Sequence, residues 1–364
     1  MRPIGLCNVS YKILTKVLAQ RLRQVMGKLV HPNQCSFIPH RHSKDNIIIF
    51  QEVIHSMRYK SGNKGWMAIK IDLEKAYDRL KWNFVKDTLQ DIGLPQIFVN
   101  LIWASILSPR LRMVWNGEAL EEFTPSRGIR QGGPISPYLF VLCMERLFQL
   151  ISAAVTSDQW KPIKLSRDGR PLSHLAFADD LVLFAEASIN QVEIIKTCLD
   201  LFCASSGQKV SLEKTRIYFS KNVNHSIREE ISSTFGYQCI DNLGKYLGIP
   251  AHHSRVCHRD YQGLIEHVSR RGWKTSALLF MGRLTLCKSV LSTIPSYTMQ
   301  SVYLPRSTCD EIDRICRDFL WGGSRNNRRF HAIGWNKVCM AKEPGGLGLR
   351  SIRNVNTSFM IKNG

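Results

Sequence analysis

Acidic residues are scarce in this chain. Its 364 residues include 29 Asp and Glu against 50 Lys and Arg, so the formal net charge is +21 with histidine neutral. Because 44% of the residues are hydrophobic, the chain can bury a core, and intrinsic disorder is excluded for most of its length.

Disulfide, membrane and secretion signals are also lacking. No Cys-x-x-Cys pair occurs among the 11 cysteines, so we expect reduced and mostly buried thiols. The longest uncharged stretch, Ile92–Pro109, contains Gly93 and Pro95 and falls short of the ~20 apolar residues of a membrane-spanning helix. The first residues lack the apolar core of a signal peptide. We expect a soluble intracellular chain with no membrane partner.

The excess of positive charge is concentrated at the two ends of the sequence. Residues 1–60 hold 10 basic and 2 acidic residues, and residues 265–364 hold 16 and 6. The centre, residues 61–264, holds 24 and 21 and is nearly neutral. Two cationic arms around a centre rich in carboxylates are typical of a protein that binds a polyanion, because each Lys or Arg set against a phosphate releases counterions. A solvated basic surface is the alternative.

The spacing of apolar residues predicts a mixed α+β chain with antiparallel hairpins, since helices and strands do not alternate regularly. We expect helices at Val9–Leu29, Ile47–Met57, Trp82–Ile92, Ile97–Leu107, Ser136–Val155 and Asn190–Ser206. Strands are expected at Trp66–Ile71, Arg110–Trp115 with a return toward Phe123, His174–Ala178 and Leu181–Ala185. The last third is predicted to be helical, at Leu264–Leu291 and Cys309–Trp321.

Three carboxylates stand at the ends of the predicted strands. Asp72 closes one strand, and Asp179 and Asp180 occupy a tight turn between two others. Adjacent carboxylates repel each other unless a cation joins them, and Mg²⁺ prefers oxygen ligands of this kind. If Asp72 reaches the same edge of the sheet, the three can hold two ions about 3.5–4 Å apart, as nucleotidyl transfer requires. The alternative is a plain hairpin turn, where aspartate is favoured without any metal.

Several sequence motifs occur in an order typical of one family. They are Arg2–Leu6 with Tyr11–Ile13, Gln34–Arg41, Ile71–Asp78, Arg127–Pro137, Phe177–Asp180, Ser206–Lys214 and Tyr246–Pro250. Together they resemble the reverse transcriptase of non-LTR (LINE-type) retrotransposons, especially those of plants. The match covers nearly the whole chain, and although each motif alone is weak, the complete series is highly specific.

The resemblance implies a right-hand polymerase fold with fingers, palm and thumb. It assigns residues 1–257 to the fingers and palm, 258–330 to a helical thumb, and 331–364 to a linker or truncated connection region. Asp72, Asp179 and Asp180 would be the catalytic residues and the ligands of two Mg²⁺ ions, for which Mn²⁺ can substitute.

The resemblance also implies a nucleotide pocket. Tyr77 would lie against the incoming sugar and exclude a 2′-hydroxyl, Gln131 would line the pocket, and Gly132 would let the backbone approach the substrate. Arg41 would contact phosphate as a planar donor fork, and Lys214 would approach the triphosphate. A core tyrosine and ordinary surface cations are the alternative interpretations of Tyr77, Arg41 and Lys214.

Two positions depart from the family pattern. His40 stands where the family usually has glycine, and Gly133 stands where it commonly has aspartate. If the loop around His40 requires a positive φ, His40 is strained there. The sequence also lacks the upstream endonuclease and the downstream region of the family, so we expect a fragment of a longer polyprotein.

The expected reaction is RNA-directed DNA synthesis, with an RNA template, a DNA primer and deoxynucleoside triphosphates as partners. Two alternatives stay open. One is a catalytically inactive RNA-binding remnant or maturase-like module, and the other is an RNA-dependent RNA polymerase that would use Asp78 to recognise a ribose hydroxyl. We expect the protein in the nucleus or the cytoplasm, and the resemblance implies the nucleus. The sequence does not determine the oligomeric state.

Overall fold

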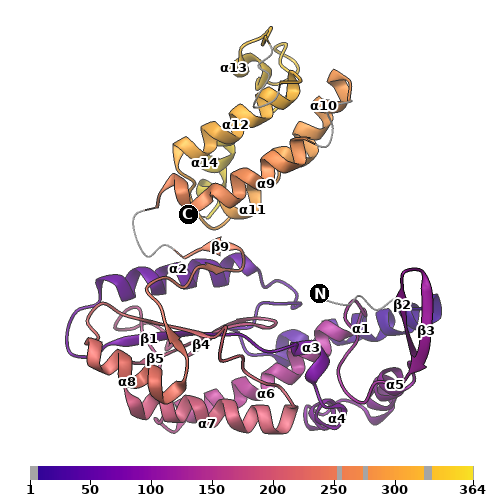
Figure 1. Cartoon of the computed structure of the whole chain (residues 1–364), viewed down its shortest axis with the longest axis vertical. Helices are drawn as coiled ribbons and strands as arrows, with labels where there is room; N and C mark the ends of the chain where they lie inside the picture. Colours follow the sequence, from indigo (N-terminus) through magenta and orange to yellow (C-terminus); the bar gives the residue numbers. More distant parts are fainter. Residues whose placement is uncertain (1–6, 252–255, 274–277, 324–329, 364) are drawn as a thin grey trace. The chain divides into compact units, whose positions relative to one another are not determined.

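The computed structural model describes residues 7–251, 256–273, 278–323 and 330–363. The chain forms two compact units, Met1–Leu247 and Gly248–Gly364 (Figure 1). Their boundary lies ten residues before the predicted end of the palm at residue 257. The motif Arg2–Leu6 and part of the helix expected at Leu264–Leu291 lie outside the described residues. The separation of a thumb from a connection region at residue 330 stays a prediction.

A five-stranded sheet organises the first unit, in the order β4-β5-β1-β6-β7. All neighbours pair antiparallel except β6 and β7, which are parallel. The strands are β1 (Trp66–Ile71), β4 (His174–Phe177), β5 (Asp180–Glu186), β6 (Arg216–Phe219) and β7 (Gln238–Cys239). A separate hairpin, β2 (Leu111–Trp115) and β3 (Glu118–Phe123), turns at the predicted Asn116-Gly117, and a short β8 (Lys245–Tyr246) follows.

Helices cover both faces of this sheet. Figure 1 shows α6 and α7 along one face and α2 along the other. The helices of the first unit are α1 (Val9–Leu29), α2 (Ser43–Tyr59), α3 (Ala76–Arg79), α4 (Trp82–Asp91), α5 (Gln96–Leu107), α6 (Ser136–Thr156), α7 (Ile189–Ser206) and α8 (His225–Phe235). Because helices cover both faces, four of the six residues of β1 are buried, and Lys70, the charged residue of the strand, is half-buried.

Helix α6 forms the centre of the core. Its side chains Leu139, Phe140, Leu147 and Phe148 are fully buried. The helix is long and apolar enough to cross a membrane by length and composition, but most of it is buried within the unit. Its apolar character is therefore accounted for by packing, as in the core helix of a globular domain.

The second unit is helical, as predicted for this part of the chain. It contains β9 (Ile249–Pro250), a 3₁₀ turn (His258–Tyr261), α9 (Gln262–Trp273), α10 (Phe280–Leu286), a π-helical turn (Cys287–Leu291), α11 (Ser296–Met299), α12 (Arg306–Leu320), α13 (Trp335–Val338) and α14 (Ile352–Asn363). Helix α12 packs against α9 and α14 and buries Cys309, Ile312 and Cys316.

A buried polar cluster joins α6 to β4 and to the loop after α1. The ring of His174 stacks on Phe148, with centroids 4.5 Å apart, and lies 4.8 Å from the ring of His31. Burial lowers the pKa of His174 to about 3, so this ring stays neutral. The backbone N–H of His31 donates to Glu145 Oε2 at 2.9 Å. Burial raises the pKa of Glu145 to about 7, and this bond and the charge of Arg41 oppose the rise.

This cluster predicts a pH-dependent stability. Because the folded-state pKa of Glu145 is raised, its contribution to stability is present below the ordinary glutamate pKa and is lost as the pH rises through about 7. The lowered pKa of His174 acts in the opposite direction, because that ring is protonated only in the unfolded chain below about pH 6.5. We therefore expect the free energy of unfolding of the wild type, measured relative to that of Glu145→Gln, to fall by up to ~3 kcal/mol between about pH 5 and pH 8.

Urea denaturation at a series of pH values measures the effect. Glu193→Gln, on the exposed face of α7, serves as the matched control and keeps the wild-type dependence on pH. Equal pH dependence in the wild type and in Glu145→Gln would show that Glu145 does not titrate in this range.

Candidate active site at the edge of the sheet

The candidate site lies at the hairpin that joins β4 to β5. Phe177 pairs with Asp180, so Ala178 and Asp179 form a two-residue loop. Ala178 has a φ of +54°, a conformation that favours glycine in a loop of this length. Asp179 is half-buried and Asp180 is exposed. The predicted position of the two aspartates, in a tight turn between apolar strands, is confirmed.

Asp72 lies at the same edge of the sheet. Strands β1 and β5 pair antiparallel, and their pairing ends with Ile71 opposite Leu181. One further step in this register sets Asp72 opposite Asp180. Directly opposed residues of an antiparallel pair have Cα atoms about 5 Å apart. The backbone therefore brings together two aspartates that are separated by more than a hundred residues of sequence.

The loop before β6 holds Asp72 from its other side. The N–H of Asp72 donates to Thr215 Oγ1 at 3.2 Å, and its carbonyl accepts from the N–H of Ser211 at 2.8 Å. Lys214 of this loop places its Nζ 3.9 Å from Asp72 Oδ1, and its side chain is 70% exposed. Such an exposed ion pair is weak, so the ammonium can turn toward another anion. The contact of Lys214 with a triphosphate stays a prediction.

A second cation, Lys70, is subject to the charges of Asp180 and Asp72. Its Nζ donates to the carbonyl of Lys245 at 2.5 Å. Burial lowers the pKa of Lys70, and the negative charges of Asp180 and Asp72 oppose this lowering. Both carboxylates are therefore close enough to act on one ammonium, which offsets part of their mutual repulsion.

The donor chemistry of this edge fits a divalent cation. Asp72, Asp179 and Asp180 supply carboxylate oxygens, which hard cations such as Mg²⁺ prefer. As the side chains stand, the described part of the chain contains no group of three or more His, Cys, Asp or Glu arranged to hold a metal ion. Convergence is thus a property of the backbone register here, and the assignment of the three aspartates as metal ligands stays a prediction.

Gln34 connects the loop after α1 to the aspartate hairpin. Its side chain is fully buried, and its Oε1 accepts the N–H of Ala178 at 3.1 Å and that of Ser36 at 2.9 Å. The N–H of Cys35 donates to the carbonyl of Ala176 at 3.1 Å, so this loop lies against the edge of β4. Gln34 therefore fixes the residue immediately before the aspartate pair.

Tyr77 lies in α3, close to the hairpin. Its ring stacks on Phe140 of α6, with centroids 4.7 Å apart and 12° between the ring planes. Burial raises the pKa of Tyr77 to about 12, and the negative charge of Asp179 adds to the rise. The hydroxyl therefore stays protonated at neutral pH. Stacking fixes the ring beside the candidate site, and its contact with an incoming sugar stays a prediction.

Gln131 and Gly132 lie in the segment that packs against the chain after β1. Gln131 Nε2 donates to Asp78 Oδ1 at 3.1 Å, and both residues line a cavity of about 290 Å³. Gly132 is exposed and has a φ of +86°, where a residue with a side chain is strained. A Cβ on Gly128 would come within 2.7 Å of the carbonyl oxygen of Asp78, so this segment needs glycine to approach.

Arg41 has a different environment from the one expected. Its Nη1 donates to the carbonyls of His31 and Gln34 at 2.6 and 2.8 Å, and its Nη2 to those of Val30 and Gly27 at 2.9 and 3.3 Å. The guanidinium thus binds the end of α1 and the loop that follows. A phosphate would have to displace these carbonyls, so the contacts do not favour the predicted phosphate role, which stays untested.

The departure from the family at position 40 has a structural consequence. His40 is exposed and has a φ of +65°, so the loop does require the left-handed conformation that glycine adopts without strain. Gly133 does not have a positive φ, and a Cβ there would lie 2.8 Å from Ser136 Oγ. An aspartate at this position would displace that hydroxyl.

Three polar residues of the site were given no role from the sequence. Gln34 and Asn46 bind Ala178 and Ala176, partners that lie more than a hundred residues away, so no local signal identifies them. Lys70 did carry a signal, because it is a charged residue within an apolar strand. Such a residue is costly to bury without a partner, and here its ammonium donates to the carbonyl of Lys245, with the charges of Asp180 and Asp72 also acting on it.

Comparison with known proteins identifies the family. The family model described as reverse transcriptase (RNA-dependent DNA polymerase) matches residues 1–251. The chain therefore belongs to the reverse transcriptase family. This confirms the predicted family and, with it, the α+β polymerase fold class.

Its relatives include retrotransposon proteins. The chain is 24% identical over 368 residues to the transposon TX1 uncharacterized 149 kDa protein of Xenopus laevis, covering 99% of this chain and 27% of the relative. It is 32% identical over 214 residues to the Pol polyprotein of the type-2 retrotransposable element R2DM of Drosophila melanogaster, covering 58% and 19%. The chain thus spans about a quarter or less of these proteins, which confirm the resemblance to non-LTR retrotransposon reverse transcriptases.

Among solved structures, the telomerase of Candida albicans in complex with a fragment of telomeric RNA is similar to this chain. The alignment covers 96% of this chain and 56% of the telomerase chain. The TM-score is 0.45 and the identity 11%.

The contacts of Gln34 predict a positioning role. In Gln34→Met the shape is kept, but the N–H groups of Ala178 and Ser36 lose their acceptor. We expect the free energy of unfolding to fall by about 1–3 kcal/mol. DNA-synthesis kcat falls at least about tenfold because the hairpin is no longer fixed, and RNA affinity stays within twofold.

The matched control is Gln24→Met, the same substitution on the exposed face of α1, which leaves both properties unchanged. Urea denaturation and single-turnover primer extension on the two variants measure stability and rate separately. An unchanged kcat in a destabilised Gln34→Met would mean that Gln34 only stabilises the fold.

Proposed function

We propose that this chain carries the polymerase centre of a retrotransposon reverse transcriptase and copies RNA into DNA at the β1/β4–β5 edge. One observation carries the proposal: the register of β1 and β5 sets Asp72 opposite the aspartate hairpin. In the reaction, the 3′-hydroxyl of a primer attacks the α-phosphorus of a deoxynucleoside triphosphate, and pyrophosphate leaves. No nucleophilic side chain is needed.

Asp72, Asp179 and Asp180 would hold two Mg²⁺ ions, for which Mn²⁺ can substitute. When bound, these ions supply charge stabilisation for the attacking and leaving oxygens. The general use of divalent metal ions by this family supports the assignment. The carboxylates give the ions a negative site in which Lys70 already offsets part of the repulsion between Asp72 and Asp180.

Neighbouring side chains would orient the nucleotide. Lys214, beside Asp72, would turn toward the triphosphate. Tyr77, held by its stack on Phe140, would exclude a 2′-hydroxyl by its bulk. The hydrogen bond from Gln131 engages Oδ1 of Asp78, one oxygen of the carboxylate that an RNA polymerase of the alternative kind would use for a ribose hydroxyl.

The substrates follow from the family and from the charge of the chain. An RNA template and a DNA primer are polyanions, and a net charge of +21 favours their binding in a salt-dependent way. The expected site of action, the nucleus, rests on the family's use of chromosomal DNA as a primer. Activity of this chain without further segments is part of the proposal.

The direct test is Asp179→Asn, which keeps the shape of the turn and removes one negative charge. We expect Mg²⁺-dependent extension of a DNA primer on an RNA template to fall below about one hundredth of the wild-type rate. RNA affinity stays within twofold, because cations supply it. Extension assays with Mg²⁺ and with a chelator, and fluorescence anisotropy of labelled RNA, give the two quantities.

Asp87→Asn, on the exposed face of α4, is the charge-matched control and retains full activity. Persistent extension in Asp179→Asn would refute the carboxylate assignment. A wild-type chain that binds RNA in a salt-sensitive way but extends no primer would instead be the RNA-binding remnant.

Tyr77 gives a second test, of sugar selection. Tyr77→Ala removes the ring that would exclude a 2′-hydroxyl, so incorporation of ribonucleotides relative to deoxynucleotides rises at least about tenfold. Tyr77→Phe keeps the ring and its stack on Phe140, and it keeps the wild-type ratio. Preference of the wild type for ribonucleotides, or an unchanged ratio in Tyr77→Ala, contradicts the role of Tyr77.

A further inference from the structure

A basic groove lies at the end of the sheet opposite to the aspartates. Trp66 and Glu186 form the first pair of the β1/β5 ladder, six residues along the strand from Asp72. At about 3.3 Å per residue this is roughly 20 Å from the aspartate edge. The groove has a volume of about 880 Å³ and lies between the end of α2, the start of β1 and the loop after α6. This size is within the range of ligand-binding sites.

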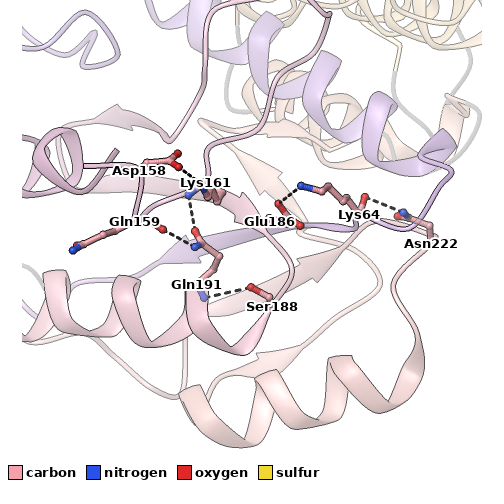
Figure 2. A network of polar contacts seen from close by, with 8 residues as sticks. All are labelled: Lys64, Asp158, Gln159, Lys161, Glu186, Ser188, Gln191 and Asn222. Carbon is pink, nitrogen blue, oxygen red and sulfur yellow. Dashed lines mark hydrogen bonds and ion pairs between the residues drawn. The ribbon is translucent and has the colours of Figure 1, made fainter. Parts of the chain in front are cut away.

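Positive charge dominates the groove. Its lining includes five Lys or Arg and two carboxylates. Both carboxylates are paired: Lys64 Nζ lies 3.6 Å from Glu186 Oε2, and Lys161 Nζ lies 2.5 Å from Asp158 Oδ2 (Figure 2). The other three cations have no ion pair with any residue that the structure describes, and they are Lys60, Lys164 and Arg167. The groove therefore carries positive charge that no carboxylate neutralises.

An exposed aromatic ring stands beside these cations. Tyr59, the last residue of α2, is 63% exposed although it is a large hydrophobic residue. The guanidinium of Arg58 lies 5.0 Å from the centre of its ring, and the ring of His55 lies 4.9 Å away. Trp66, by contrast, is covered by the ammonium of Lys60, 3.9 Å above its ring. Tyr59 is thus the ring on which a flat ligand can stack.

Buried amides hold one wall of the groove in place. Gln191 is buried; its Oε1 accepts the N–H of Lys161 at 2.7 Å, and its Nε2 donates to the carbonyl of Gln159 at 2.7 Å. The N–H of Gln191 in turn donates to Ser188 Oγ at 3.4 Å. Figure 2 shows these contacts converging on the loop after α6. This wall is therefore formed before any ligand binds.

The opposite wall is held in the same way. Asn222 Nδ2 donates to the carbonyls of Gly62 and Lys64 at 2.8 and 3.1 Å. The N–H of Trp66 donates to Ser220 Oγ at 2.8 Å, which itself donates to Asn222 Oδ1 at 2.6 Å. A groove with two fixed walls loses little conformational entropy when a ligand binds.

We propose that this groove binds single-stranded RNA, holding phosphates with Lys60, Lys164 and Arg167 and stacking a base on Tyr59. Unpaired cations beside an exposed aromatic ring are the combination that binds single strands without reading their sequence. An acidic peptide would satisfy the cations but would leave Tyr59 without a flat partner. The proposal goes beyond the polymerase centre, because RNA bound here lies several nucleotides from the aspartate edge.

The charge test uses Lys164→Ala/Arg167→Ala in the full chain. Both residues are exposed on a loop held by backbone bonds between Ile163 and Leu172, so the fold is kept. Lys60 is left in place because it packs on Trp66. We expect the slope of log affinity against log salt for a labelled single-stranded RNA to fall by about 1.4, since each phosphate contact contributes about 0.7.

The control for charge is Lys86→Ala/Lys196→Ala, which removes two lysines of α4 and α7 that have no ion pair with a described residue. Its slope stays at the wild-type value. Equal reductions in both double variants mean that RNA binds diffusely to the basic surface, and they overturn the proposal.

The stacking test uses Tyr59. Tyr59→Ala weakens RNA binding about tenfold, because base stacking on an aromatic ring is lost, and Tyr59→Phe keeps it. Extension of a short primer–template duplex that does not reach the groove stays at the wild-type rate in all these variants. Unchanged RNA affinity in Tyr59→Ala overturns the proposal. A wild-type chain that extends no primer would contradict the proposed polymerase centre, whereas RNA affinity alone tests the groove.

Discussion

The antiparallel pairing of β1 with β5 is the constraint on which the rest of the structure depends. It joins a strand near residue 70 to one near residue 182 and sets the end of β1 level with the β4–β5 turn. Side chains in a sheet have a period of two, so a slip of one residue would turn Asp72 to the other face. Helices α2, α6 and α7 bury the apolar residues of β1 and β5 and thereby fix this register.

Gathering carboxylates at one edge has an energetic cost, and the surrounding residues offset it. Ala178 adopts a left-handed conformation that costs of order 1 kcal/mol, and a buried amide, Gln34, holds it there. Lys70 and Lys214 lie close enough to Asp72 to offset the repulsion between carboxylates. A strained backbone and adjacent like charges at one turn are typical of a functional site. Both lower the stability of the fold, so stability does not explain their presence.

The sequence predicted the local elements well, because their signals are local. Helix α1 has the predicted bounds, the β2–β3 hairpin turns at Asn116-Gly117, and α7 ends at Ser206, capped by Gly207 with a φ of +79°. Helix α6 begins at Ser136, as predicted, and ends at Thr156, one residue beyond the predicted Val155. This difference of one residue changes nothing in the site.

Long-range contacts could not be predicted in the same way. The contact of Gln34 with Ala178 and the hydrogen bonds of Arg41 to backbone carbonyls depend on how distant segments pack, and a single sequence does not record this. The prediction of one helix over Leu264–Leu291 is wrong, because α9 ends at Trp273 and α10 begins at Phe280, with Leu278 and Leu279 not helical. The region ends in a π-helical turn at Cys287–Leu291, for which apolar periodicity gives no signal. The family motifs singled out Asp72, Asp179 and Asp180 as candidate metal ligands. The β1–β5 register then showed that Asp72 lies opposite the hairpin that holds the other two.

The central claim is that Asp72 shares a cation site with the aspartate hairpin. Titration of the protein with Mn²⁺, followed by electron paramagnetic resonance, tests it without any substrate. The account predicts that Asp72→Asn and Asp180→Asn each weaken Mn²⁺ binding at least about tenfold, and that Asp87→Asn leaves it unchanged. If Asp72→Asn keeps the wild-type affinity for Mn²⁺, Asp72 and the aspartates of the hairpin do not bind the same ion.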